Sequence, residues 1–238
     1  MSTNCSHLTQ VAVSLGTVAT KQRAAQRRNR ERDLIAATRA LFDERGVQDA
    51  PIEEIAKTVG IARGLIYRQF SSKEELFVAT VADYLIELAA DLDAAEAAAG
   101  TDPVVRLERM AEAYAWFCER YPAFLDSALL IMRRPARELN QIVSEVIWLR
   151  LGRAMIDCID HVARILRAGD EADVFDVEDP DFTANILWTQ MLGAMQLARI
   201  RVGMKRDGAG APELFRVEAE QVVRGCVESA LATVRAKD

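Results

Sequence analysis

The stretch IEEIAKTVGIARGLIYRQFSSKEEL, residues 52–76, has the pattern of two short helices joined by a tight turn. In its first half, aliphatic residues recur three and four positions apart until a glycine, which readily adopts the left-handed cap of a helix, ends the run. These residues are Ile52, Ile55, Ala56, Val59 and Gly60. A second short helix can begin after Ala62, with Ile66 and Phe70 pointing inward. Two short helices around a glycine-containing turn match the helix-turn-helix unit.

A longer helix is predicted on each side of this unit. Before it, a helical stripe ends at Gly46, and arginines crowd the first turns of that helix or the arm that precedes it. The stripe consists of Leu34, Thr38, Leu41, Phe42 and Arg45, and the arginines are Arg27, Arg28, Arg30 and Arg32. After the unit, Ser72 and Glu75 form a capping box that opens a helix with a long apolar face.

Charge is distributed unevenly along the chain, which has 238 residues and a net charge of −6. Residues 21–73 contain 12 lysines and arginines against 7 acidic residues, whereas the other positions contain 18 against 29. A basic segment on an acidic protein is typical of a chain that binds a polyanion at one end. Charge alone is equally compatible with basic residues that decorate a solvated helix.

The second short helix would be the one that enters the major groove of DNA. Its outward residues combine hydrogen-bond donors with an aromatic ring, and they are Arg63, Gly64, Leu65, Tyr67, Arg68 and Gln69. An arginine can bridge two acceptors on guanine or bind a phosphate, and a tyrosine hydroxyl can donate to a phosphate. Lys73 opens the next helix, where unpaired backbone N–H groups and a cation together favour a phosphate. These residues predict contact with double-stranded DNA.

Residues 30–76 resemble the DNA-binding domain of the TetR family of bacterial transcriptional regulators. The resemblance rests on the order and spacing of IAATRALFDERG, IEEIAKTVGIARGLIYRQF and SSKEEL. It implies that Tyr67 and Lys73 contact the DNA backbone, and that other residues of the second short helix face bases or phosphates. The implied DNA-binding residues are Arg63, Gly64, Leu65, Tyr67, Arg68 and Lys73. Ala50 and Ala62 depart from the family pattern, so two helix caps are expected to be missing, each worth about 1 kcal/mol.

The remainder of the chain is predicted to be helical. Prolines at 103, 122 and 135, the acidic stretch 169–180 and the sequence DGAGAP at 207–212 separate five further apolar-periodic segments, so nine helices and no strand are expected. We therefore expect an all-α fold, in which a three-helix helix-turn-helix domain is joined by a long helix to a helical bundle. The expected divisions are a flexible extension at residues 1–26, a DNA-binding domain at 27–76, and a ligand-binding and dimerisation domain at 77–238.

The segments between residues 103 and 168 are apolar on more than one side, as the walls of a cavity would be. From these segments we predict a ligand site at Tyr114, Phe117, Phe124, Met132, Trp148 and Met155. An ordinary core would explain each residue singly. The resemblance implies a small lipophilic effector in this bundle. The candidates for a polar anchor of this effector, for each of which the sequence favours a surface role instead, are Arg133, Arg134, Arg150, Arg153 and His161.

The last two predicted helices carry more apolar surface than one domain needs. Residues 186–204 are apolar nearly all round. The final helix has one apolar face, formed by Ala219, Val222, Val223, Cys226, Ala230, Leu231 and Val234. A pair of helices that meets its symmetry mate would bury this surface in a four-helix homodimer interface, which is where the resemblance places dimerisation. Two-fold symmetry would let two helix-turn-helix units read a palindrome with half-sites about 34–36 Å, or a multiple of that, apart.

The sequence disfavours an enzyme or a metalloprotein. It has two histidines, His7 and His161, far apart, and neither Glu-x-x-His nor HExxH. The acidic stretch 169–180 lacks the spacing of a calcium loop, so neither a metal nor a cofactor is expected. The four cysteines form no CxxC pair, which indicates reduced thiols in the cytoplasm. No segment has the pattern of a signal peptide or a membrane span.

Together these patterns predict a ligand-responsive transcriptional regulator. The expected form is a repressor that binds a palindromic operator as a dimer and is released by a small lipophilic effector. The alternative is an all-α small-molecule-binding protein or enzyme without DNA binding, which the basic segment and the order of the motifs disfavour.

Overall fold

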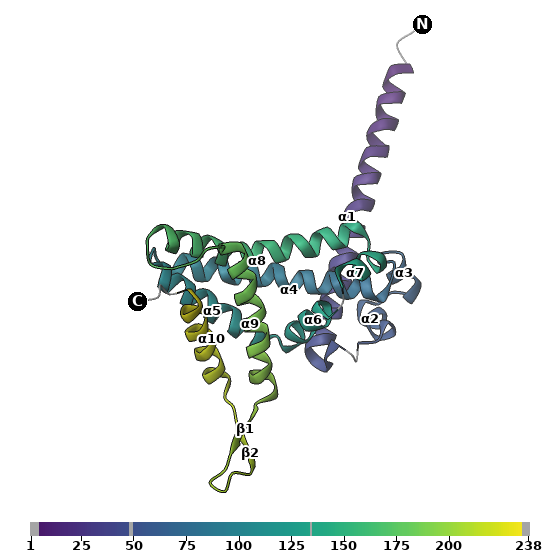
Figure 1. Ribbon diagram of the computed structural model, residues 1–238. Coiled ribbons are helices and arrows are strands. Elements are labelled where there is room, and N and C mark those ends of the chain that lie inside the picture. Colours follow the sequence, from purple (N-terminus) through teal and green to yellow (C-terminus); the bar gives the residue numbers. More distant parts are fainter. Residues whose placement is uncertain (1–4, 48–49, 134, 235–238) are drawn as a thin grey trace.

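The computed structural model describes residues 5–47, 50–133 and 135–234, and of residues 5–21, 23–24, 136 and 139–140 it describes the backbone only. In this described part the chain forms ten helices and one two-stranded hairpin (Figure 1), which confirms the all-α prediction. The elements are α1 (Cys5–Arg45), α2 (Ile52–Val59), α3 (Arg63–Tyr67), α4 (Lys73–Ala98), α5 (Pro103–Arg120), α6 (Pro122–Met132), α7 (Ala136–Ile142), α8 (Glu145–Glu171), α9 (Pro180–Ile200), β1 (Val202–Arg206), β2 (Pro212–Arg216) and α10 (Ala219–Val234).

The helix-turn-helix unit forms as the sequence predicts. Pro51 precedes α2 in an extended conformation, and Gly60 follows it with a φ of 71°, where a side chain would be strained. Ile66 of α3 and Phe70 after it are each 1% exposed. They pack in one apolar core with Leu34 and Phe42 of α1, so three short segments of sequence close into a single unit.

The first helix begins much earlier than the sequence analysis predicted. We expected residues 1–26 to be a flexible extension, but α1 is helical from Cys5, and residues 1–4 lie outside the described part. Figure 1 shows this part of α1 projecting from the body of the molecule. Residues 5–45 contain no proline and one glycine, Gly16, so the local sequence offers little to end a helix there.

The long helix α4 connects α1, α2 and α3, which we call the N-terminal unit, to the rest of the molecule. It packs along α8, while α5, α9 and α10 pack together at the end away from α3 (Figure 1). The single helix expected after Pro135 is two helices, α7 and α8, because Ser144 is extended with a ψ of 152° and precedes α8. The described part of the chain therefore has ten helices, one more than the nine predicted.

Arg39 of α1 ties the N-terminal unit to α4. Its guanidinium lies 3.2 Å from Asp83 and 2.5 Å from Glu87, and 4.1 Å above the ring centre of Tyr84. The Arg39 side chain is only 14% exposed, so solvent screens these contacts less than it would screen a surface pair. The two helices thus form one packed layer at this point.

A β-hairpin replaces the end of the eighth predicted helix. We expected a helix to reach Met204 and no strand, but α9 ends at Ile200, and Arg201 takes a left-handed backbone with φ of 54°. Strand β1 then pairs antiparallel with β2, with Met204 opposite Leu214. The turn between them is the DGAGAP segment that the sequence identified as a break, and Figure 1 shows the hairpin projecting beyond α9 and α10.

The apolar face of α10 is buried within its own chain. Val223 is 5% exposed and Cys226 is 3% exposed, and α10 packs on α5 and α9. The expectation that this face meets a second copy is therefore wrong. Its periodicity was read correctly, but periodicity does not say which partner covers a face.

Two further findings concern the cysteines and the apolar length of the helices. Cys118, Cys158 and Cys226 are buried free thiols, and burial raises the pKa of Cys158 to about 12 and that of Cys226 to about 11. Thiols of this kind are poorly reactive because little thiolate forms. Among the helices described, none is long and apolar enough to cross a membrane.

Candidate functional site

The short helix α3 presents most of the predicted DNA-binding residues on one exposed surface. Arg63, Gly64, Tyr67 and Arg68 are exposed, and Leu65 is half-buried. An added Cβ at Gly64 would meet no atom of the protein within 4 Å, so the backbone there can be approached closely. The lack of a side-chain cap at Ala62 matches the expectation from the sequence.

Arg63 is held by neighbours on the same surface. Its guanidinium lies 2.6 Å from Oε1 of Glu53 in α2, and it donates a hydrogen bond of 3.4 Å to the Tyr67 hydroxyl. The hydrogen bond to Tyr67 and the charge of Glu53 raise the pKa of Arg63. A base or phosphate would have to replace Glu53 as its partner. Within the described residues, Arg68 forms no ion pair, so it needs no such exchange.

Gln69 has a different role from the one that the sequence suggested. Its amide donates to Oε2 of Glu31 at 2.9 Å, and Arg150 of α8 donates to Oε1 of Glu31 at 3.0 Å. Glu31 of α1 therefore connects the residues that follow α3 to α8, and the sequence analysis did not predict this contact. Because Glu31 lies beside the end of α3, the exposed Arg27 and Arg28, one turn earlier on α1, lie near the same surface.

The start of α4 is capped by Ser72, whose Oγ accepts a hydrogen bond of 3.0 Å from the Glu75 N–H. This confirms one half of the predicted capping box. Glu75 makes different contacts: its Oε2 accepts from the backbone and hydroxyl of Ser71, and its Oε1 accepts from the backbone and hydroxyl of Ser144. Ser144 stands before α8, so one carboxylate joins the DNA-binding unit to the bundle. We call this set of contacts the Glu75 clasp.

Glu75 is charged at neutral pH although it is 4% exposed. Burial by itself raises the pKa of a carboxyl group, but the hydrogen bonds donated by Ser144 and Ser71 outweigh burial and bring the pKa of Glu75 below its ordinary value. The clasp is therefore an arrangement that favours the carboxylate form.

The predicted ligand-binding residues do not line one cavity. Tyr114 lines a cavity of about 30 Å³ between α5, α8 and α9, whereas Phe124, Met132 and Met155 line another of about 30 Å³ between α4, α6 and α8. Phe117 is fully buried against Phe124, with ring centres 5.2 Å apart. Trp148 is half-buried against the core and lines neither of these cavities.

Trp188 of α9 lines both of these cavities, and the sequence analysis did not select it. Its ring meets that of Tyr114 edge to face at 4.8 Å. The only signal in the sequence was the apolar character of α9 on all sides, which did not single out one residue. Space of about 30 Å³ holds one or two water molecules and is too small for an effector, so an effector here requires lining side chains to move.

The Tyr114 hydroxyl is buried, and no group in the described part of the chain meets the geometry of a hydrogen bond with it. The Cys118 thiol, a weak hydrogen-bonding group, lies nearby and adds to burial in raising the pKa of Tyr114. The polar anchors that we considered do not reach it. Arg133 and Arg153 are exposed, Arg150 pairs with Glu31, and Arg134 lies outside the described residues. The imidazole of His161 is buried, but its Nδ1 lies 2.8 Å from Oε2 of Glu96, away from both cavities. Tyr114 is therefore the polar group available to a ligand in this part of the bundle.

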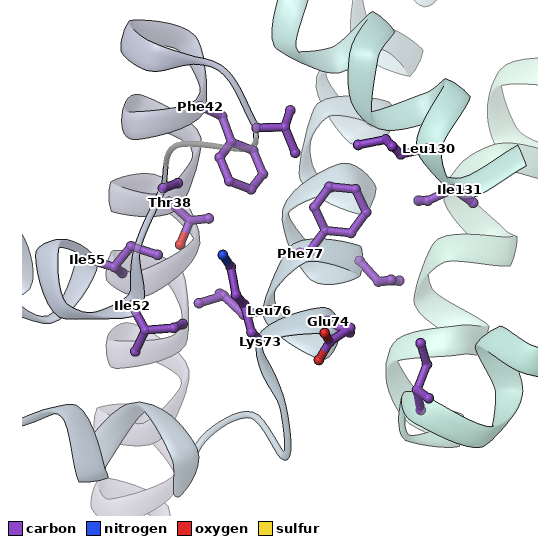
Figure 2. A pocket seen from close by; sticks show the side chains of 14 residues that line it. Thr38, Phe42, Ile52, Ile55, Lys73, Glu74, Leu76, Phe77, Leu130 and Ile131 are labelled. Atoms are coloured by element: carbon purple, nitrogen blue, oxygen red, sulfur yellow. The ribbon is translucent and has the colours of Figure 1, made fainter. Parts of the chain in front are cut away.

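A larger cleft lies between the N-terminal unit and α6. It has a volume of about 240 Å³, and its walls are Thr38 and Phe42 of α1, Lys73 and Phe77 of α4, and Leu130 and Ile131 of α6, among others. Figure 2 shows the Lys73 ammonium group within this cleft, between Thr38 and Phe77. In the described residues, no group of three or more His, Cys, Asp or Glu side chains is placed to hold a metal ion.

Comparison with known proteins connects the N-terminal unit to one family. The model for bacterial regulatory proteins of the tetR family matches residues 34–80. The HTH-type transcriptional repressor AcnR of Corynebacterium diphtheriae is 38% identical over 50 residues, which are 21% of this chain and 26% of that protein. The chain thus aligns with about a quarter of the length of this relative.

Solved structures extend the likeness to most of the chain. PfmR, a TetR family transcriptional regulator from Thermus thermophilus, superposes with a TM-score of 0.56 and 25% identity over 84% of this chain and 97% of its own. RolR in complex with resorcinol superposes with a TM-score of 0.59 and 20% identity over 89% of this chain and 90% of its own. The bundle, as well as the N-terminal unit, therefore has a fold known from other proteins.

Proposed function

We propose, from the match of residues 34–80 to the model for bacterial regulatory proteins of the tetR family, that the protein is a ligand-responsive transcriptional repressor of that family. It binds a palindromic operator as a homodimer and is released by a small lipophilic effector. The observation that carries the proposal is the exposed α3 surface, where Arg63, Tyr67 and Arg68 surround an open glycine beside the arginines of α1. We propose a domain division near residue 76, and we place the protein in the cytoplasm, where DNA is accessible.

The residues of this surface have separate roles in DNA recognition. Arg63 and Arg68 reach base edges or phosphates, Tyr67 and Lys73 bind the DNA backbone, and Gly64 and Leu65 allow close approach and apolar contact with a base. Without DNA, Arg63 pairs with Glu53, which orients the guanidinium group. On binding, a base or phosphate replaces Glu53 as its partner. Such an exchange favours DNA sequences that offer Arg63 two acceptors.

Selection of bound duplexes from a random library tests the proposal. The wild-type protein should enrich a palindrome, and Arg63→Ala should weaken binding by about 1–3 kcal/mol and relax preference at one position of each half-site. Lys73→Ala should weaken binding to all duplexes and reduce the slope of log K against log salt by about one. Failure to enrich any duplex would favour the alternative, a small-molecule-binding protein without DNA contact.

We place the effector site at Tyr114 and Trp188. The buried, unpartnered hydroxyl of Tyr114 offers a hydrogen bond, and rotation of the Trp188 ring would join the two small cavities that it separates. An effector that is mainly apolar with one hydrogen-bonding group fits this lining. The resorcinol complex of RolR, a protein of the same fold, supports a small effector of this chemistry without identifying it.

We place the homodimer interface on the exposed sides of α9 and α10. In α9, Ile186 follows Phe182 by four positions and Ile200 follows Leu197 by three, with a step of eleven across Gly193 between the two pairs. These four residues are 36% to 63% exposed. The exposed positions of α10 include three small residues, Gly225, Ser229 and Ala232, which allow close approach of a second helix. An apolar stripe beside small residues favours a helical interface with a symmetry mate.

The hairpin extends this interface. On one side of the hairpin, Phe215 covers Gly203, and the Lys205 ammonium group lies 3.4 Å from the Glu213 carboxylate. The side chains on this side therefore contact one another across the two strands. On the other side, Met204 and Leu214 face each other across the strands and are 71% and 65% exposed. An isolated two-stranded hairpin is marginally stable in water. A second copy that covers this side would stabilise the hairpin as an arm of the dimer.

A further inference from the structure

The cleft between the DNA-binding unit and α6 has the features of a second ligand site. Its inner wall is apolar and closed, since Phe42, Ile55 and Leu76 are 3% exposed or less. Phe77, Leu130 and Ile131 are partly exposed and form its outer wall. Its volume of about 240 Å³ lies between the roughly 150 Å³ that holds benzene and the roughly 300 Å³ at which pockets for larger ligands begin.

One cation lies in this apolar setting. Figure 2 shows the ammonium group of Lys73 directed into the cleft, while the carboxylate of Glu74, which also lines it, is directed away from that ammonium group. Both residues are exposed, so solvent and a ligand can reach the ammonium group. Among the described residues, no carboxylate lies within ion-pair distance of Lys73. An ammonium group beside apolar walls favours a ligand that carries one negative charge at the end of an apolar body.

We propose that this cleft binds a monocarboxylate with a medium-length apolar chain or a single aromatic ring. The carboxylate binds Lys73, and the apolar body lies between Phe42 and Phe77 on one side and Leu130 and Ile131 on the other. This cleft is distinct from the Tyr114 and Trp188 site: it shares no lining residue with the Tyr114 cavity, and only Ile131 with the second cavity that Trp188 lines.

The site has a consequence for DNA binding that rests on the proposed function. Lys73 is the residue that we assign to a DNA phosphate, and one ammonium group held in the cleft by a carboxylate cannot also bind the backbone. The ligand also contacts both α1 and α6, so it acts on the placement of the DNA-binding unit against the bundle. Bound carboxylate therefore weakens DNA binding, and DNA weakens carboxylate binding by the same factor.

Calorimetric titration with octanoate and with 1-octanol, at neutral pH and without DNA, tests the site. These probes share a chain length and differ in charge. The wild-type protein should bind octanoate about tenfold more tightly than 1-octanol, as a charge-assisted hydrogen bond provides. Lys73→Gln should remove this preference, whereas Lys57→Gln, the same change on an exposed lysine of α2 outside the cleft, should keep it. Equal affinity of the wild-type protein for both probes, or an unchanged preference in Lys73→Gln, would overturn the proposal.

A second pair of variants tests the location. Leu130→Phe fills the cleft and should reduce octanoate binding at least about tenfold, and Leu149→Phe, the same change at a residue of α8 that is 46% exposed, should not. Thermal unfolding of each variant checks that it is folded. Octanoate that still binds a folded Leu130→Phe protein with wild-type affinity would place the ligand elsewhere.

Because these titrations omit DNA, their outcome is separate from that of the proposed function. A protein that enriches a palindrome but does not bind octanoate loses the carboxylate site and keeps the regulator role. A protein that binds octanoate through Lys73 but enriches no duplex keeps the site and loses the regulator role. The competition itself is checked by repeating the octanoate titration with the selected duplex, where undiminished affinity would contradict it.

Discussion

Glu75 shows how one side chain connects two parts of this molecule. As Glu75 belongs to the first turn of α4, local sequence makes it a capping residue. In the folded chain its carboxylate instead accepts hydrogen bonds from Ser71, near α3, and from Ser144, at the start of α8. Movement of the DNA-binding unit against α8 would break these bonds, so the clasp opposes such movement.

Glu75→Gln should destabilise the protein by about 2–3 kcal/mol, because hydrogen bonds to a buried charged group are among the stronger ones. The lowered pKa of Glu75 means that its contribution is fully present above the ordinary value of 4.5 and is lost as the pH falls through the lowered value. Urea unfolding at pH 7 and at pH 4 measures this: the difference between the two proteins should shrink at the lower pH. Glu145→Gln, at an exposed first-turn position of α8, is the control and should change little.

Tyr114 is a residue at which stability and function should oppose each other. Its hydroxyl is buried without a partner in the described structure, so Tyr114→Phe removes an unsatisfied group and should stabilise the protein by about 1 kcal/mol. The same change should weaken effector binding, because the hydrogen bond to the effector is lost. Thermal unfolding and titration with small phenols, starting from resorcinol, measure the two effects. A destabilised Tyr114→Phe protein would show that the hydroxyl has a structural partner.

At the scale of elements, α9 and α10 show that two apolar faces of similar pattern have different partners. The face of α10 packs on α5 in the same chain, whereas the exposed stripe of α9 has no cover among the described residues. The projecting hairpin continues from the end of that stripe (Figure 1). This arrangement moves the expected dimer surface from the apolar face of α10 to the outer side of α9.

Leu197→Glu and Val223→Glu separate these two surfaces. Leu197 is 40% exposed, so its replacement should leave a folded monomer, whereas Val223 is 5% exposed, and a carboxylate there should destabilise the chain by several kcal/mol. Sedimentation gives the assembly state and circular dichroism the folding. Ile156→Glu, at an exposed residue of α8, is the control and should remain a dimer. A dimeric Leu197→Glu protein would remove α9 from the interface.

At the scale of the whole molecule, the polar contacts that connect the N-terminal unit to the bundle include the Arg39 pairs with α4, the Glu31–Arg150 pair and the Glu75 clasp. We propose that an effector between α5, α8 and α9 changes DNA binding by favouring one packing of α8 against α4, because α8 carries Arg150 and follows directly after Ser144 of the clasp. The required coupling follows from linkage: a hundredfold loss of operator affinity needs about 2.7 kcal/mol.

Coupling of this kind must be reciprocal, so operator DNA should weaken effector binding by the same hundredfold. Tryptophan fluorescence follows effector binding, since Trp188 lies at the proposed site. The titration is made with and without a saturating amount of the selected duplex. Glu75→Gln should reduce the coupling while leaving effector affinity in the absence of DNA unchanged. Equal effector affinity with and without duplex would contradict the proposed release mechanism.

Local sequence by itself determined the helix-turn-helix unit. Spacing of aliphatic residues, Gly60 with its left-handed backbone and the Ser72 cap depend on neighbours a few positions away, so their pattern can be read without the fold. The same holds for the exposed donors of α3. The long helices and the prolines that open α5, α6 and α9 were predictable for the same reason.

Only the tertiary structure decided which groups meet. Glu31 with Gln69 and Arg150, Glu75 with Ser144, and Trp188 with Tyr114 are pairs far apart in sequence, and no local pattern specifies them. Burial of the α10 face on α5, and the hairpin after Arg201, likewise depend on long-range packing that overrides local preference. Periodicity states that a face is apolar, but the partner that removes this face from water is set by the whole chain.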